Sequence, residues 1–437
     1  MPTRLTAALP VLGALLATIR NLLSPEVIGR VPDDAFFYLV IARNLAQGLG
    51  FSFDGREVTT GFHPAWLALV RALPLGSPEA GFAGLLVLHG GMTALAASAL
   101  YLLLRRAGAG ALHAGLFSFA AGAWGASAYG LGMETALVSA ALLGALLFPG
   151  LGLVAGLARP DALPVLLSAG RRAFGLGLIG VGAVLFFNRL VGGEWVSTSV
   201  ALKGLGTLAW RWERLDGAVV WRHVPGPTLA ALGVALVMRV RRVPLGPAAP
   251  AAALAAGVLV AEYLLDDLVG PWYHLPLAWL LLAVAGRTRF GAFVVGLVLL
   301  RGVPLPDRSL HSTVRAFATE VVASTPEGSR LIAEDFPGML AWFGARDILP
   351  ADGLAASVAY RPALVAGEGI AWWRARGATH WVTTRRRAPW LEARPLVDRL
   401  APPFLPVPEE PIVLAPEAMR GKAVDPDSDR LFAVFEL

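Results

Sequence analysis

The chain has 437 residues, of which 56% are hydrophobic and 16% are charged, and its mean hydropathy is +0.62. Soluble domains usually contain about 45–50% apolar and about 25% charged residues, so this composition excludes an ordinary soluble protein as well as disordered and collagen-like chains. The chain contains no cysteine, which excludes a disulfide scaffold and any thiolate-bound metal centre.

Charged residues divide the chain into two parts. Residues 1–304 contain 36 charged side chains, about 12% of that part, whereas residues 305–437 contain 32, about 24%. This contrast predicts a membrane domain over 1–304 and a soluble domain over 305–437. The formal net charge is +6, but the arginines occur in short pairs between apolar runs, which is typical of positive-inside topology and not of nucleic-acid binding.

The first apolar run, Leu5 to Leu23, is predicted to be a retained first helix and not a signal peptide. Arg20 lies near its end and no small-residue cleavage site follows. Most of the later apolar runs come close to the about 20 residues that a spanning helix needs. These runs occupy residues 81–104, 111–130, 132–148, 151–170, 173–191, 225–240, 247–265, 272–286 and 288–304.

Arginine clusters predict the orientation of these helices, because basic residues stay on the cytoplasmic side of a membrane. One path places every cluster inside if residues 151–170 form a broken hairpin that turns at Arg159-Pro160, where proline removes a backbone donor. The clusters are Arg105/Arg106, Arg171/Arg172, Arg239/Arg241/Arg242 and Arg287/Arg289.

This path predicts a polytopic α-helical protein of the cytoplasmic (inner) membrane with about eleven crossings, counting the two half-helices. Its N-terminus lies inside, and the C-terminal domain lies outside. The loops expected on the outer side are 24–80, 192–224 and 266–271, and they contain every acidic pair of the membrane part.

The last third alternates helical and strand-like patterns, which predicts a small α/β domain docked on the outer face. Helices are expected over Arg308–Thr325, Phe336–Phe343 and Ala363–Arg376. Strands are expected over Arg330–Ala333, His380–Thr383, Pro411–Leu414 and Leu431–Phe435.

An acidic pair, Asp33-Asp34, follows the outer end of the first helix and precedes a predicted amphipathic helix, Ala35–Gln47. Two interpretations are open. The carboxylates cap the helix, where they satisfy free amides and the helix dipole. Alternatively, they act as a general base or bind a divalent cation, because partial desolvation at a membrane boundary raises a carboxyl pKa towards a useful value.

The residues after this pair, FFYLVIARNLAQGLGFSFDG and TTGFHPAW, resemble the opening loop of GT-C glycosyltransferases. The branch is that of the bacterial relatives of protein O-mannosyltransferases and aminoarabinose transferases, glycosyltransferase family 39-like. Further family-like motifs follow in order over most of the chain: Gly132-Met133-Glu134-Thr135-Ala136, Leu157-Ala158-Arg159-Pro160-Asp161, GGEWVSTSVALKG at 192–204, and EDFPGMLAWFG followed by ILPADGL. The chain departs from the family at Ser197, where a proline is usual.

The resemblance implies an enzyme that transfers a monosaccharide from a polyprenyl-phosphate donor to a glycan, lipid or protein acceptor on the outer face, usually with inversion. Asp33 matches the first acidic residue of the motif and is the expected base, with Asp34 as the alternative. A divalent cation at this pair stays open, and no other cofactor is implied.

A lipid phosphate leaving group needs positive charge and hydrogen-bond donors near the membrane surface. Arg159, at the tip of the broken hairpin, offers a planar fork for phosphate oxygens, although it is also placed to pair with Asp161 or Glu134. Lys203, in the outer loop, is a second candidate or a solvated lysine. His63, before the next apolar helix, contacts the donor phosphate, assists proton transfer, or is an ordinary interface histidine.

Other polar residues are expected to support the site. Glu134 begins a helix, where it caps amides and orients Arg159. Arg43 is expected to hold the first outer loop together with Asn44 and Asp54. His274 follows Trp272-Tyr273 at another outer boundary, where it contacts the donor or belongs to an aromatic belt.

Two other classes of function are weighed against a transferase. A transporter or flippase also has broken helices and intramembrane charge, but it usually shows inverted repeats, which are absent from this sequence. A non-catalytic membrane protein that binds lipid-linked sugars would tolerate loss of Asp33 and Asp34. HExxH, P-loop and GxSxG motifs are absent, which argues against the corresponding metalloprotease, nucleotide and hydrolase chemistry.

Overall fold

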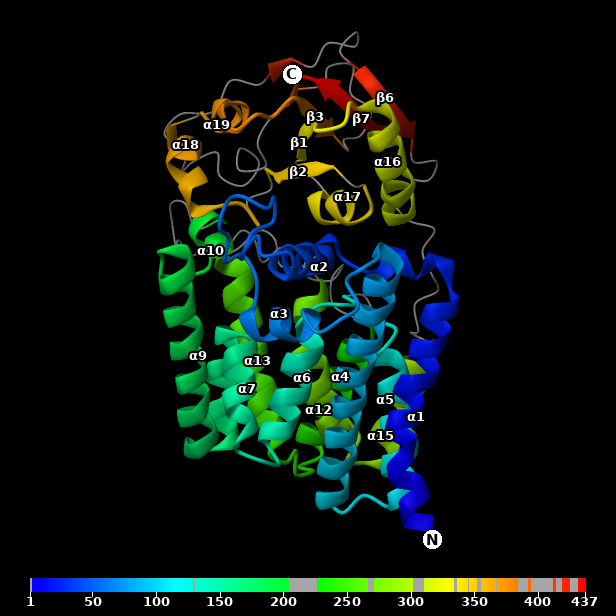
Figure 1. Ribbon diagram of the computed structural model, residues 1–437. Helices are drawn as coiled ribbons and strands as arrows, with labels where there is room; N and C mark the ends of the chain where they lie inside the picture. The colour runs from blue at the N-terminus through cyan, green and yellow to red at the C-terminus, as the bar shows by residue number, and fades with distance from the viewer. Residues whose placement is uncertain are drawn as a thin grey trace.

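A computed structural model shows a helical bundle with a smaller domain on one end (Figure 1). The N-terminus lies at the opposite end of the bundle from this domain, which contains the C-terminus. The structure describes residues 2–128, 130–203, 226–265, 271–301, 310–333, 336–344, 346–351, 355–366, 368–383, 392–393, 412–413, 419–424 and 431–437.

Every apolar run predicted from the sequence contains a helix of the bundle. Among the described residues, three helices are long and apolar enough to cross a membrane: α1 from Arg4, α4 and α9. Several others are apolar but shorter, so the count of about eleven crossings stays a prediction. The bundle helices are α1 (Pro2–Leu23), α4 (Pro78–Arg106), α5 (Ala111–Gly125), α6 (Thr135–Ala145), α7 (Leu151–Ala158), α9 (Arg171–Gly192), α12 (Gly226–Val240), α13 (Ala248–Leu265), α14 (Leu275–Ala285) and α15 (Arg289–Arg301).

The predicted break at Arg159-Pro160 is present. Helix α7 ends at Ala158, and Arg159 has an extended backbone with φ −153° and ψ 125°. The short turn η2 (Pro160–Ala162), helix α8 (Leu163–Leu166) and turn η3 (Leu167–Ala169) then lead into α9. Because Pro160 has no N–H and restricts the residue before it, an uninterrupted helix through Arg159 is disfavoured.

Glycines allow α7 and α9 to pack closely. A Cβ atom at Gly156 would overlap the carbonyl oxygen of Gly177, and one at Gly152 would overlap the carbonyl oxygen of Ala173. Small residues let helix backbones approach each other, so these glycines have a packing role. This close approach holds α7, which ends just before Arg159, against the longer helix α9.

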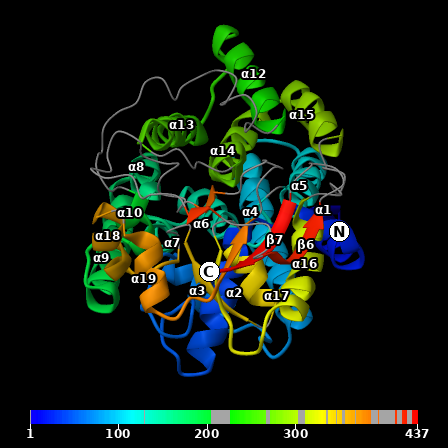
Figure 2. The same ribbon diagram turned by 90° about the horizontal axis from the view of Figure 1, so that it is seen from above.

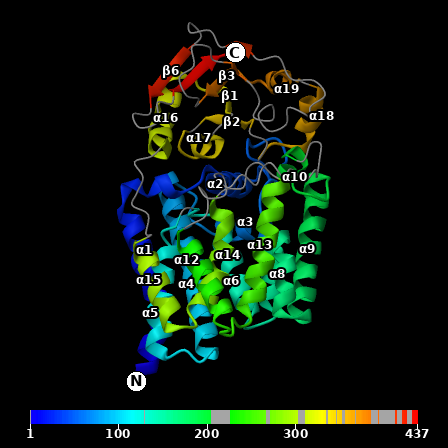
Figure 3. The ribbon, with the colours of Figure 1, turned by 180° about the vertical axis from the view of Figure 1, so that it is seen from behind.

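A layer of short elements from residues 24–80, the segment predicted to be the first outer loop, lies between the bundle and the C-terminal domain (Figures 1 and 3). It consists of η1 (Pro25–Arg30), α2 (Asp33–Ala46) and α3 (Pro64–Val70). Helix α2 was expected to be amphipathic, yet every residue from Ala35 to Ala42 is buried. Burial on all sides follows from its position, since it has the bundle beneath it and the domain above it.

The C-terminal domain contains a five-stranded mixed sheet in the order β2-β1-β3-β7-β6. Strand β1 is parallel to β2 and β3, whereas β7 is antiparallel to β3 and β6. Strands β4 (Glu392–Ala393) and β5 (Ile412–Val413) pair with each other. The remaining elements are α16 (Leu310–Ser324), β1 (Arg330–Ala333), α17 (Pro337–Phe343), β2 (Asp347–Pro350), η6 (Val358–Tyr360), α18 (Arg361–Ala366), α19 (Gly369–Ala375), β3 (His380–Thr383), β6 (Met419–Val424) and β7 (Leu431–Glu436).

Most of the helices and strands predicted for this domain are present, but one predicted helix is divided. The single helix expected over Ala363–Arg376 is two helices, α18 and α19, with Glu368 between them in a non-helical conformation (φ −116°, ψ 22°). Strands β2, β4 and β6 were not predicted.

The domain is docked on the first outer loop mainly through α17, which packs against α2. The Phe343 ring centroid lies 5.5 Å from that of Phe36, and Trp342 Nε1 donates a hydrogen bond to the carbonyl oxygen of Pro78 at 3.0 Å. Viewed from above, α17 lies beside α2 and α18 lies near α10, while α12 and α15 extend beyond the domain (Figure 2).

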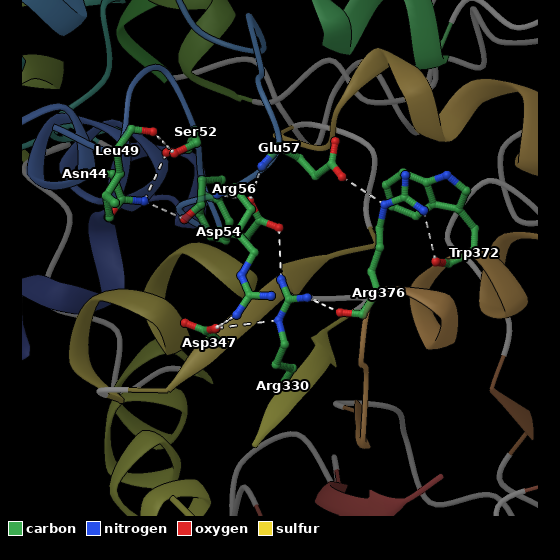
Figure 4. A network of polar contacts seen from close by, with 11 residues as sticks. Asn44, Leu49, Ser52, Asp54, Arg56, Glu57, Arg330, Asp347, Trp372 and Arg376 are labelled. Carbon is green, nitrogen blue, oxygen red and sulfur yellow. Dashed lines mark hydrogen bonds and ion pairs between the residues drawn. The ribbon is translucent and has the colours of Figure 1, made fainter. Parts of the chain in front are cut away.

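Ion pairs reinforce this docking beside α17 (Figure 4). Arg330 Nη2 lies 3.2 Å from Asp54 Oδ2, and both side chains are buried. Arg376 Nε donates to Glu57 Oε1 at 2.9 Å. Burial removes water from the Arg330–Asp54 pair, so losing one partner would leave an uncompensated charge. The domain and the outer loop therefore form one continuous contact.

The close packing of α7 and α9 predicts a contrast between two glycines. Gly156→Ala should destabilise the protein by about 1–3 kcal/mol, because its methyl group has no space against α9. Gly182→Ala should leave stability unchanged or raise it by up to about 1 kcal/mol, because no heavy atom lies within 4 Å of its Cβ position and alanine favours a helix. Thermal unfolding of the purified variants in detergent checks both, and equal unfolding temperatures would contradict the packing role.

Candidate functional site

Polar side chains from six separate segments meet at the end of the bundle that lies beneath α2. We call this group the Arg159 cluster. Besides the break after α7, it draws on the second turn of α2, the start of α3, the start of α6, the end of α13 and the turn η5 (Pro271–His274). Its members are Tyr38, His63, Glu134, Arg159, Asp161, Glu262 and Tyr273.

Arg159 is the centre of the cluster, and its side chain is only 5% exposed. Nε donates to Asp161 Oδ1 at 2.8 Å and Nη2 donates to Asp161 Oδ2, a bidentate pair. Nη2 also donates to Glu262 Oε1 at 2.7 Å. The Tyr273 ring covers the guanidinium, with Cζ 4.4 Å from the ring centroid. Charge-assisted bonds and ring stacking hold this cation in one orientation.

Glu134 joins Arg159 to the first outer loop. Its side chain is 1% exposed, and Oε1 lies 3.9 Å from Arg159 Nη1 and 3.6 Å from His63 Nε2. Oε2 accepts a hydrogen bond from the Tyr38 hydroxyl at 3.1 Å. The side chain makes no capping hydrogen bond at the start of α6, so the predicted contact with Arg159 is present and the predicted capping is not.

His63 precedes α3 at the edge of the cluster. Burial among the surrounding elements lowers the pKa of its imidazole, and the nearby Arg159 charge acts in the same direction. The carboxylates of Glu134 and Asp161 oppose this effect without reversing it. The neutral imidazole is therefore the dominant form at pH 7, and it is able to accept a proton as well as donate a hydrogen bond.

The structure separates the two members of the acidic pair. Successive residues of a helix point about 100° apart, so Asp33 and Asp34 face different surroundings. Asp33 reaches the C-terminal domain, where Oδ2 accepts from the Gly338 amide at 2.9 Å and Oδ1 from the Met339 amide at 2.6 Å. Asp34 lies close enough to Tyr273 for its charge to act on the phenol. Asp33 is thus directed to the start of α17, while Asp34 is the member whose charge acts on Tyr273, the ring that covers Arg159.

Three other predicted site residues are not among the members of the Arg159 cluster. Arg43 lies near the end of α2 with the domain: Nη2 donates to the Ala341 carbonyl oxygen at 3.1 Å, and the guanidinium lies 5.1 Å from the Trp342 ring centroid. His274 is 1% exposed and immediately follows Tyr273. Lys203 ends α10 (Thr198–Lys203), but its side chain lies outside the described residues.

The loop that departs from the family pattern at Ser197 is anchored to the first outer loop. The Thr60 amide donates to Thr198 Oγ1 at 2.9 Å, and the Thr198 amide donates to Thr60 Oγ1 at 3.0 Å. Ser197 Oγ accepts from the Val200 amide at 3.3 Å, a contact typical of a helix start. The serine therefore supports the beginning of α10.

Sequence reasoning missed Glu262, although a signal was present. Glu262 is the one ionisable carboxylate in the otherwise apolar stretch Ala248–Leu265. A charged residue within such a stretch is energetically costly and usually functional. The argument that predicts a role for Arg159 therefore predicts one for this glutamate as well. Tyr38 and Tyr273 carried no comparable signal, because aromatic residues are common at membrane boundaries.

A cavity of about 460 Å³ lies between the end of α2, the following loop and the C-terminal domain, away from the cluster. Arg43, Asp54 and Arg346 are among the residues that line it, and no member of the Arg159 cluster does. Arg43 follows Asp34 by nine residues, which places it about 13 Å further along the helix. The cavity is therefore a separate polar space.

Within the described part of the chain, no group of three or more His, Cys, Asp or Glu side chains is arranged to hold a metal ion. The cluster instead offers one fixed guanidinium, a neutral imidazole and several carboxylates. No family model, curated protein or solved structure matches the chain. Functional conclusions consequently rest on these residues and on their geometry.

The contacts of Asp33 predict a structural effect of its loss. Asp33→Ala should lower stability by about 1 kcal/mol, as removal of a helix-capping side chain usually does. Asp33→Asn should retain most of the native stability, because asparagine is an equally good acceptor for the α17 amides. Thermal unfolding measures the change, and limited proteolysis reports whether the domain is loosened. Equal stability of the alanine variant and the native protein would contradict the capping role.

The lowered pKa of His63 predicts a pH dependence of stability. A histidine whose pKa is lower in the folded protein than in the unfolded chain favours folding above the unfolded pKa and loses that contribution as pH falls through the folded pKa. The stability of the native protein relative to His63→Gln should therefore decrease between pH 7.5 and pH 5. Unfolding temperatures of both proteins over this range provide the test, and a constant or growing difference would be the contrary result.

Proposed function

We propose that the protein is an integral membrane glycosyltransferase of GT-C type. It transfers a monosaccharide from a polyprenyl-phosphate donor to a glycan, lipid or protein acceptor on the outer face of the cytoplasmic membrane. The observation that supports this most is the buried Arg159 at the end of the bundle that faces the C-terminal domain, covered by Tyr273, on which the charge of Asp34 also acts. Sugar transfer from a phosphate needs a carboxylate for the acceptor and a cation for the leaving group at one site.

The positions of the arginine pairs support the proposed orientation. Helix α4 starts next to the domain, through the bond from Trp342 to Pro78, and ends at Arg105/Arg106. Its 29 residues span about 43 Å, so this pair lies at the far end of the bundle. Helix α9 starts at Arg171/Arg172 and ends at Gly192, which contacts Thr60 of the outer loop. The positive-inside rule then assigns the far end to the cytoplasm and the cluster to the outside.

The side chains on the bundle surface fit a lipid environment and a lipid donor. Large apolar side chains on several helices are exposed, among them Leu178, Ile179 and Phe186 of α9 and Leu232 and Leu236 of α12. A prenyl chain gains about 0.8 kcal/mol for each methylene buried in the bilayer, so the donor keeps its tail in the membrane. Its phosphate is thereby presented at the level of the Arg159 cluster.

In the proposed reaction, Asp34 takes the proton from the acceptor hydroxyl as that oxygen attacks the anomeric carbon. The bond between this carbon and the phosphate oxygen breaks, and the bonding electrons leave with the polyprenyl phosphate. Arg159 stabilises the negative charge of this leaving group. Attack from the side opposite the phosphate inverts the anomeric centre. The base is assigned to Asp34 because both oxygens of Asp33 accept amides of the C-terminal domain.

A flippase for lipid-linked sugars is the second candidate function. The broken segment between α7 and α8 and the buried charge of Arg159 favour it, since transporters use interrupted helices at their substrate sites. The two functions differ in their products, because a flippase moves the donor without cleaving it. A non-catalytic binder of lipid-linked sugars would likewise leave the donor intact.

The proposal predicts different effects at the two aspartates. Asp34→Asn should lower the rate of sugar transfer by about 10²–10⁴-fold, the usual contribution of a general base. Asp33→Asn, the matched control one residue away, should keep a rate near that of the native protein once its stability is taken into account. The measurement is release of polyprenyl phosphate from a labelled polyprenyl-phosphate sugar by purified protein with membrane extract as acceptor source. Undiminished release by Asp34→Asn, or intact donor with every variant, would contradict the proposal.

A further inference from the structure

Two arginines outside the Arg159 cluster lie at the end of α1 that faces the C-terminal domain. Arg20 is in the last turn of α1, and Arg30 ends η1, the turn that follows this helix directly. Both are attached to the segment after α5. Arg20 Nη2 donates to Ser127 Oγ at 2.9 Å, and the Gly130 amide donates to the Arg30 carbonyl oxygen at 3.2 Å. The two side chains are close enough for the charge of Arg20 to act on Arg30.

Arg30 is a buried cation that lacks a partner. The residue is 4% exposed, and its enclosed Nε forms no hydrogen bond. Among the residues that the structure describes, none forms an ion pair or a hydrogen bond with the Arg30 guanidinium. Burial and the charge of Arg20 lower the pKa of Arg30 to about 10, and the carboxylate of Glu26 opposes this effect only in part. A buried charge is costly unless it is paired, so an anion bound here would stabilise the folded protein.

The surface beside the two arginines is apolar. Helix α1 is long and apolar enough to cross a membrane, and Arg20 lies three residues before its end at Leu23. Arg20 itself is exposed, and so are its neighbours Ile19, Leu22 and Leu23. An arginine near the end of a spanning helix places its charge at the level of the lipid headgroups, while apolar side chains of the same helix contact the acyl chains. The ligand that fits this surface combines a negative charge with an apolar tail.

We propose that Arg20 and Arg30 bind the phosphate of an anionic phospholipid whose acyl chains lie along the exposed apolar side of α1. Guanidinium groups bind phosphate oxygens through parallel charge-assisted hydrogen bonds, and the phosphate offsets the repulsion between the two cations. A zwitterionic lipid fits less well, because its ammonium group cancels the charge of its phosphate. The site is independent of the proposed function. It holds η1, which leads directly into α2, so the bound lipid steadies the layer between the bundle and the C-terminal domain.

The test measures thermal unfolding of the purified full-length protein in an uncharged detergent with added dioleoylphosphatidylglycerol, which is anionic, or dioleoylphosphatidylcholine, which is zwitterionic. The anionic lipid should raise the unfolding temperature of the native protein more, because a ligand that binds only the folded state stabilises it. Arg30→Gln should need about tenfold more of this lipid for the same rise, since it loses charge-assisted hydrogen bonds. Arg20→Gln should also need more. Arg71→Gln, which removes an exposed charge after α3, is the matched control and should respond as the native protein does.

Three results would overturn the proposal. The first is an equal rise with both lipids, and the second is an undiminished response to the anionic lipid in the folded variants of Arg20 and Arg30. The third is the same rise with inorganic phosphate alone, which would identify a free anion and not a lipid as the ligand. Arg20→Gln decides the matter if Arg30→Gln does not fold, because the side chain of Arg20 is exposed and its loss disturbs the packing least.

Discussion

A guanidinium that is 5% exposed has to be paired, and the pairing of Arg159 constrains much of the surrounding architecture. The chain breaks at Pro160, and Asp161 turns back onto the Arg159 side chain. Helices α13 and α6 contribute Glu262 and Glu134 from distant positions in the sequence. Removing any of these partners leaves a buried cation less compensated. These ion pairs therefore tie the break after α7, α6 and α13 to one point beneath α2.

Helix α2 connects this point to the C-terminal domain. Asp33 holds the start of α17, and the charge of Asp34, one residue later, acts on Tyr273 of the Arg159 cluster. Gly338 allows this close contact, because a Cβ at that position would lie 2.6 Å from the Asp33 carbonyl oxygen. A shift of the domain relative to the bundle would move Asp34 with it. The domain is thus positioned to influence how the proposed base meets its acceptor.

The sequence predicts the helices and the break well, because both follow from local patterns. Long apolar runs give the bundle helices, and Pro160 gives the interruption at Arg159. Strands β1 and β3 are short apolar runs and have the predicted bounds, whereas β6 contains Arg420, Gly421 and Lys422 and has no strand-like pattern. Such residues are tolerated there because β6 is an edge strand that pairs only with β7.

The sequence also predicts part of the candidate site, because local patterns identify some of its residues. His63, Glu134, Arg159 and Asp161 were expected at one outer site and lie together. The distinct roles of Asp33 and Asp34 depend on contacts with residues that follow them by hundreds of positions, and no local pattern contains this information. The pairing of Glu262 with Arg159 joins residues 103 positions apart and was missed for the same reason.

The claim on which the account depends most is that the Arg159 cluster and the C-terminal domain face away from the cytoplasm. Because the chain contains no cysteine, a single introduced thiol reports its own side of the membrane. Gln47→Cys lies at the exposed end of α2, and Arg172→Cys lies at the start of α9. In intact cells, a membrane-impermeant maleimide should label Gln47→Cys at once and Arg172→Cys only after the membrane is opened. The reverse pattern, or labelling of both from outside, would contradict the account.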